Sequence, residues 1–316
     1  MIKYMDETSE LGKIFEGFDN PNHNDPEQRK RASMFAKALN VKGRAIDIGY
    51  GSNLSVARGF IDAGLEAYAL DKKVSEEIEE RFGVESGLDE KPRLIYENEG
   101  IKILLGDVDK LDLPEKFDLA VFWGSWSSAG NNFSIEETAL SKYYQNHPEL
   151  IGTKEYSLNE ETTKNVYAKE KTTVLEKLVK HMNPGGIIAI VSSNYARHGE
   201  GFDPERYNNE RTGYLKALEY LKELGAKELY LIGDSKQKSL QLMRESFSDE
   251  ITKMFNNARN PSANMPKNKE IRLVMPDKDD VKWVISKYGD EVSAIITEIK
   301  QTDLPIIHAK AAVARF

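Results

Sequence analysis

The 316-residue chain predicts an α/β fold with a doubly wound, mostly parallel sheet. Short apolar runs, such as 45–48 and 117–122, alternate with segments whose apolar residues recur at helical spacing. Two glycines, Gly49 and Gly51, directly follow the first apolar run and precede a helical pattern. A strand, a tight turn and a helix in this order begin a βαβ unit, and such units build parallel sheets.

The glycine turn at 49–51 is the first candidate ligand site. Glycine adopts backbone conformations that side chains forbid, and it lets a ligand approach the main chain closely. The helix that begins near Leu54 offers unpaired backbone N–H groups at its N-terminus. A dinucleotide fingerprint requires glycine in place of Leu54 and has no acid at the position of Asp47. An ordinary turn in an α/β domain is the alternative interpretation.

The remaining elements follow in the order that such a sheet requires. Strands are predicted at 66–70, 101–105, 187–191 and 228–232, and helices at about 26–39, 54–63, 159–182 and 204–224.

An acid, Asp71, lies at the end of the second predicted strand, twenty residues after Gly51. In nucleotide-binding α/β folds an acid at this place accepts hydrogen bonds from ribose hydroxyls. The alternative is an N-cap of the helix predicted to begin at Ser75, because aspartate is favoured at that position.

Four signals occur in one order and together resemble the class I S-adenosylmethionine (SAM) dependent methyltransferase family. They are D-x-G-x-G at 47–51, Asp71 after the second strand, Gly-Asp at 106–107 and Asn-Pro-Gly-Gly at 183–186. The family often has a further glycine where this chain has Asn53. The resemblance implies a Rossmann-like sheet of seven strands, with helices on both faces and an antiparallel last strand, and SAM as the cofactor.

The resemblance also divides the chain. It implies a SAM-binding core at 41–234 and a closing strand at 304–316, and 1–40 is interpreted as an N-terminal helical cap. The chain departs from the family pattern in a lid-like insertion at 127–158 and a helical insertion at 235–303. The lid is predicted because the segment is long, polar and aperiodic and leaves the carboxyl end of the fourth strand, where ligands bind in α/β folds.

Cofactor contacts are implied for eight residues: Asp47, Gly49, Tyr50, Gly51, Asp71, Asp107, Val108 and Trp123. By resemblance, Asp107 meets the adenine amino group and the N–H of Val108 lies on the adenine ring. Tyr50 is expected to line the pocket for the methionine end of the cofactor. Trp123 is a candidate for contact with the sulfonium, whose charge an aromatic ring attracts, and core packing is its alternative role.

The predicted reaction moves a methyl group from the sulfonium to an O or N nucleophile of a small or medium-sized acceptor. His198, with Tyr195 beside it, is the candidate base after the fifth strand, and Trp126 and Asn194 are candidate acceptor contacts. The alternative for His198 is a surface loop histidine. No metal is expected, because the positions after strands four and five lack carboxylates. RNA or protein acceptors, a non-catalytic SAM-binding or assembly module, and a nicotinamide-dependent oxidoreductase stay open.

The composition limits the partners and the cell compartment that the protein is expected to have. A net charge of −8 argues against binding to duplex nucleic acid, and the absence of cysteine excludes disulfides and thiolate nucleophiles. No apolar run is long enough to span a membrane, so a cytoplasmic protein is expected. The insertion at 235–303 is a candidate homodimer contact.

Overall fold

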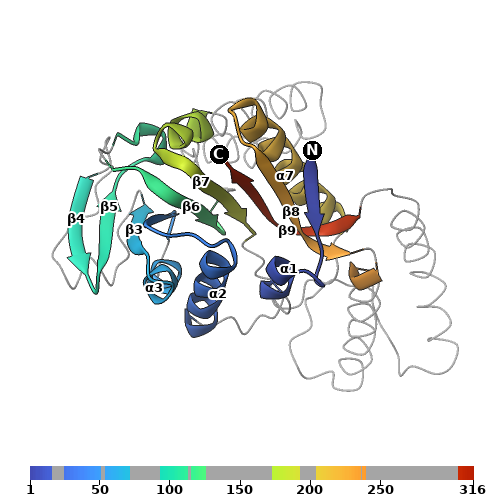
Figure 1. Ribbon diagram of the computed structural model, residues 1–316, viewed down its shortest axis with the longest axis horizontal. Coiled ribbons are helices and arrows are strands. Elements are labelled where there is room, and N and C mark those ends of the chain that lie inside the picture. Colours follow the sequence, from blue (N-terminus) through green and yellow to red (C-terminus); the bar gives the residue numbers. More distant parts are fainter. Residues whose placement is uncertain are drawn as a thin grey trace, which may run out of the picture.

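The computed structural model describes residues 1–15, 25–50, 54–71, 93–112, 115–125, 173–192, 204–235, 237–239 and 305–316. These residues build one twisted sheet with helices on both faces (Figure 1), which confirms the predicted α/β fold.

The strands lie in the order β1-β8-β9-β7-β6-β2-β3-β5-β4. In chain order their bounds are β1 (Ile2–Met5), β2 (Arg44–Ile48), β3 (Glu66–Asp71), β4 (Arg93–Asn98), β5 (Ile101–Leu105), β6 (Phe117–Trp123), β7 (Met182–Val191), β8 (Glu228–Ser235) and β9 (Ile306–Arg315). Neighbours pair in parallel, except that β4 is antiparallel to β5 and β9 is antiparallel to both β7 and β8. The antiparallel closing strand is therefore confirmed.

The sheet has two strands more than predicted, one at each edge. The first, β1, pairs in parallel with β8, so the interpretation of residues 1–40 as only a helical cap is wrong. The second, β4, forms a hairpin with β5 through the loop residues Glu99 and Gly100, whose φ angles are 51° and 80°. Two positive φ angles are what a two-residue hairpin turn of the common primed type requires.

The start of β7 differs from the prediction, which placed Met182 in the last turn of a helix. Residues 173–180 are helical, but Met182 already belongs to β7 and pairs with Phe117. Two backbone hydrogen bonds with Phe316 hold the glycines that follow. The N–H of Gly185 donates to the carbonyl of Phe316, and the N–H of Phe316 donates to the carbonyl of Gly186. Met182 is apolar and buried in β7, so hydrophobicity alone did not separate it from the helical stripe before it.

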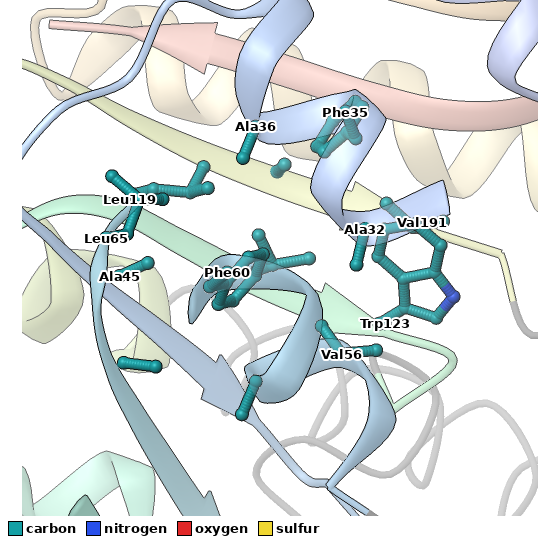
Figure 2. Packing of buried hydrophobic residues seen from close by; sticks show 14 of the residues in the cluster. Ala32, Phe35, Ala36, Ala45, Val56, Phe60, Leu65, Leu119, Trp123 and Val191 are labelled. Atoms are coloured by element: carbon teal, nitrogen blue, oxygen red, sulfur yellow. The ribbon is translucent and has the colours of Figure 1, made fainter. Parts of the chain in front are cut away.

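One face of the sheet is covered by α1 (Glu10–Ile14), α2 (Asp25–Ala38) and α3 (Ser55–Asp62). The predicted inward stripe of the second helix is buried as expected: Ala32, Phe35, Ala36 and Leu39. Figure 2 shows Ala32, Phe35 and Ala36 of this stripe near Phe60 of α3 and Trp123 of β6. Helical residues three and four apart share a face, so this spacing presents one apolar surface to the sheet.

The other face carries α7 (Pro204–Glu223) and the helix at 173–180. Here Leu218 and Leu221 of α7 pack with Leu175 and Leu178 against the strands. The chain leaves α7 through Gly225 at a φ of 105°, as predicted for a glycine stop.

The predicted lid at 127–158 lies outside the described residues, as does all of the insertion at 235–303 except Ser235 and residues 237–239. The insertion joins β8 to β9, the place in the chain order where it was predicted. Within the described ranges, no helix is long and apolar enough to cross a membrane.

Candidate functional site

Three parallel strands end at one edge of the sheet, and each is followed by a glycine with a left-handed backbone. These are Gly49 after β2, Gly106 after β5 and Gly124 after β6, with φ angles of 75°, 149° and 77°. Each glycine N–H still donates to a neighbouring strand, at N···O distances of 2.7 to 2.9 Å. The ladder therefore continues one residue past the strands before the chain turns away. Ligand sites of open α/β sheets lie at this carboxyl edge.

The turn after β2 is fixed by Ser125, a residue that the sequence did not single out. The Ser125 hydroxyl donates a short hydrogen bond to the carbonyl of Ile48. A Cβ atom on Gly49 would collide with the Ser125 side chain. Glycine is required at position 49 because of both its φ angle and this close approach.

Two carboxyl groups, those of Asp47 and Asp71, lie near this edge on the adjacent strands β2 and β3. The Asp47 side chain is 1% exposed, and its Oδ1 has no hydrogen-bond partner among the described residues. Burial, and then the negative charge of Asp71, raise the pKa of Asp47 well above its usual value. Burial and the same two acids also raise the pKa of Tyr50, which follows Gly49. A bound cation or hydrogen-bond donor would offset the repulsion between the two acids and the burial of their charge.

The residues after β5 lie beside Asp71. The N–H of Gly106 donates to the Asp71 carbonyl at 2.9 Å, and Asp107 and Val108 follow directly, both buried. Asp107 precedes the short 3₁₀ helix η1 (Val108–Lys110), but its side chain makes no capping hydrogen bond there. The fold thus brings the predicted cofactor residues of β2, β3 and β5 to one edge. Their contacts with a cofactor stay predictions.

Trp123 ends β6 on the face that α1 and α2 cover. The residue is 7% exposed, and its ring lies 6.0 Å from that of Phe35 and 6.3 Å from that of Phe15, measured between ring centroids. Figure 2 shows it at the end of the α2 stripe. These ring contacts are the ones expected if Trp123 packs in the core. Its contact with a sulfonium stays a prediction.

The other predicted site residues fall outside the described part of the chain: Gly51, Trp126, Asn194, Tyr195 and His198. Their roles are therefore untested. Within the described residues, no group of three or more histidine, aspartate and glutamate side chains is placed to hold a metal ion.

No protein family model matches the chain, and no curated protein matches it. Several solved structures do match it. A phosphoethanolamine N-methyltransferase 2 from Haemonchus contortus is 9% identical, with 96% of this chain and 59% of that chain covered and a TM-score of 0.37. The amino pentose methyltransferase CalS10 from Micromonospora echinaspora is 11% identical, with 57% and 56% covered and a TM-score of 0.32. The CcbJ methyltransferase from Streptomyces caelestis is 15% identical, with 54% of each chain covered and a TM-score of 0.32.

The matched part of this chain thus spans little more than half of each of these proteins. Similarity at these TM-scores carries no argument by itself, so the sheet decides the fold. Seven strands, β5-β3-β2-β6-β7-β9-β8, form the expected sheet, in which only the last strand of the chain, β9, is antiparallel. Helices cover both faces, and the glycine turn follows the central strand β2. The chain therefore has a Rossmann-like fold with an antiparallel last strand, the fold that the resemblance implies.

Proposed function

We propose that the chain is a SAM-dependent methyltransferase that transfers a methyl group to an O or N nucleophile of a small or medium-sized acceptor. The observation that carries this proposal is the buried Asp47 at a glycine-flanked strand end, whose Oδ1 has no hydrogen-bond partner within the described ranges and whose pKa the charge of Asp71 raises further. Such a cluster favours a ligand with positive charge and hydroxyl donors. SAM has both, in its ammonium and sulfonium groups and in its ribose.

The residues present fit this cofactor. In the proposal Asp71 accepts hydrogen bonds from the ribose hydroxyls, and Asp47 provides negative charge for the cationic end. Asp107 accepts from the adenine amino group, while the backbone N–H of Val108 faces the ring. Bound SAM supplies an activated methyl group, so the protein needs no covalent residue and acts by binding, orienting and excluding water.

The acceptor is proposed to bind where the chain leaves β6 and β7. Ser125 and Ser192 are the last described residues before two segments, and the strand ends that carry them are adjacent, because the N–H of Gly124 donates to the carbonyl of Val191. The candidate base His198 and its neighbour Tyr195 belong to the second segment. The first segment contains Trp126, proposed to contact the acceptor, and the proposed lid at 127–158.

Titration calorimetry with SAM, S-adenosylhomocysteine (SAH) and NAD, run side by side on the purified protein, tests the cofactor. We expect SAM and SAH to bind and NAD to give no signal. Binding of NAD alone would overturn the proposal in favour of an oxidoreductase. Tight binding of SAM without methyl transfer to any acceptor in a pool of metabolites would support a non-catalytic module instead.

Replacement of Asp71 by alanine is expected to weaken SAM binding by roughly 1–3 kcal/mol, the cost of leaving hydrogen-bonding groups unpaired. The matched control is Asp62→Ala. Asp62 pairs on the surface with Arg29, and its loss should leave SAM affinity unchanged. Calorimetry measures both affinities, and circular dichroism checks both folds. Wild-type affinity in a folded Asp71→Ala protein would remove Asp71 from the site.

A further inference from the structure

A second group of charged side chains is buried in the sheet, away from the acids of β2 and β3. Asp234 of β8 lies between His308 and Lys310 of β9, with its Oδ2 3.2 Å from His308 Nδ1 and its Oδ1 3.0 Å from Lys310 Nζ. The three side chains are 1–3% exposed. Burial alone would raise the pKa of Asp234, but the hydrogen bond from His308 and the charge of Lys310 outweigh it and lower that pKa. Asp234 is therefore a buried carboxylate.

Irregular strand pairing brings this cluster to the carboxyl edge of the sheet. Between the pairs Ile232–Ala311 and Gly233–Ala309 the register shifts, and Lys310 is the extra residue on β9. A Cβ atom on Gly233 would collide with the carbonyl of His308, so glycine permits this close approach. Bulges of this kind re-aim side chains and are frequent beside functional sites.

The bulge lets Lys310 contact two other elements as well. Its carbonyl accepts a hydrogen bond from the N–H of Ser192, 2.8 Å away, at the exit from β7. Its ammonium donates to the carbonyl of Phe15, the C-cap of α1, at 3.2 Å. Arg31 of α2 donates to the preceding carbonyl, that of Ile14, at 2.6 Å. Two cations thus hold the C-terminus of α1, where the helix dipole favours positive charge.

Phe15 connects this anchor to the proposed site. Its fully buried ring lies 5.7 Å from that of Phe35 and 6.3 Å from the indole of Trp123, the last residue of β6. Lys310 therefore contacts both strand ends between which the acceptor is proposed to bind. It contacts the end of β7 directly, through the N–H of Ser192, and the end of β6 through Phe15, whose ring lies beside Trp123.

Stability does not account for this arrangement. Burying charges costs several kcal/mol per ion, and apolar residues of similar volume in place of a buried ion pair are often as stable or more so. The neighbouring residues of β9, Ala311 to Ala314, show that this strand accommodates small apolar side chains. What the charged cluster adds is a directed hydrogen bond to α1 that an apolar side chain cannot make.

We propose that Lys310, held by Asp234 and His308, is a positioning residue of the methyltransferase site. It fixes the C-terminus of α1, and with it the Phe15 ring against Trp123, and it fixes the exit from β7. This role rests on the proposed function. The cofactor residues belong to β2, β3 and β5, and the strands β7 and β6 separate these from β9, so Lys310 is expected to serve the acceptor side.

The test uses Trp123 as a fluorescent reporter in a protein in which Trp126 and Trp283 are replaced by phenylalanine. We expect Lys310→Met to move the Trp123 emission to longer wavelength, because water reaches an indole that Phe15 no longer covers. SAH affinity should change by less than about threefold, as is usual for sites without shared contacts. Lys310→Arg keeps the cation and should retain most of the original emission.

The single variant leaves Asp234 with less compensating charge and can fail to fold. The double variant Asp234→Asn/Lys310→Met removes both charges, and the same emission shift is expected from it. Two controls separate positioning from stability. Lys102→Met removes a lysine that pairs with Glu66 elsewhere on the sheet, and Leu218→Ala makes a cavity under α7 on the opposite face. Neither should shift the emission.

Wild-type emission in the folded double variant would overturn the proposal. So would an equal shift in Leu218→Ala at a matched loss of melting temperature. If the unmodified protein does not bind SAH, the proposed function fails, but the emission of the reporter still decides whether Lys310 positions Phe15 and Trp123.

Discussion

Replacing Asp47 by asparagine is expected to stabilise the ligand-free protein near pH 7 and to weaken SAM binding. The pKa of Asp47 is higher in the folded protein than in the unfolded chain, where it is near 3.8. The folded state then binds more protons than the unfolded state, so stability falls as the pH rises above about 4 toward the folded pKa. Asparagine does not titrate, and it removes this penalty while keeping nearly the same shape.

The loss of binding follows from the same carboxylate. In the proposed complex the charge of Asp47 meets the cationic end of SAM, and hydrogen bonds to charged groups contribute roughly 1.5–3 kcal/mol. Urea denaturation of both proteins at several pH values measures the stability gain, which should shrink as the pH falls toward 4. Calorimetry measures the affinity. A variant that is less stable than the wild type at pH 7, or that binds SAM equally well, would contradict the assignment.

Replacing Gly49 by alanine is expected to destabilise the protein and to abolish measurable SAM binding. The left-handed backbone costs a residue with a side chain about 1–2 kcal/mol. The collision with Ser125 adds an overpacking cost of about 1–3 kcal/mol. The turn must then move, and the residues on both sides of it, Asp47 and Tyr50, move with it.

Two matched variants separate these effects. Gly64 also has a positive φ, 83°, but a Cβ atom there meets nothing within 4 Å, so Gly64→Ala should show only the backbone cost and normal SAM affinity. Adding Ser125→Gly to Gly49→Ala removes the colliding side chain and should recover part of the lost stability. Denaturant midpoints for the wild type, Gly49→Ala, Ser125→Gly and the double variant give the coupling between positions 49 and 125. Equal losses in the alanine variants at 49 and 64 would show that Ser125 does not matter.

Local patterns in the sequence predicted the centre of this molecule. The strand that carries Asp47, the acid Asp71 at the next strand end and the α2 stripe around Phe35 each follow from a few neighbouring residues. In the folded protein the residues that those patterns place inward are buried. The place of Asp47, Asp71 and Asp107 at one sheet edge could therefore be predicted, because each of them lies in or just after a strongly apolar strand.

Features that depend on distant pairing could not be predicted. β1 is four residues long with Lys3 and Tyr4 exposed, and only the edge of β8 makes it a strand. Ser125 matters because β6 brings it against the turn after β2. The sequence did contain one unused signal for the buried cluster, since His308 and Lys310 interrupt an apolar strand, and charged residues in such strands are rarely buried without partners.

The position of β9 has a consequence for synthesis of the protein. β9 lies between β7 and β8, although it is made after every other described strand (Figure 1). Until it emerges from the ribosome, no other described strand joins β8 and its partner β1 to the rest of the sheet. Both β7 and β8 then present open edges, which invite pairing with other chains. We expect nascent chains stalled before residue 306 to associate with chaperones, and release to follow once β9 has closed the gap.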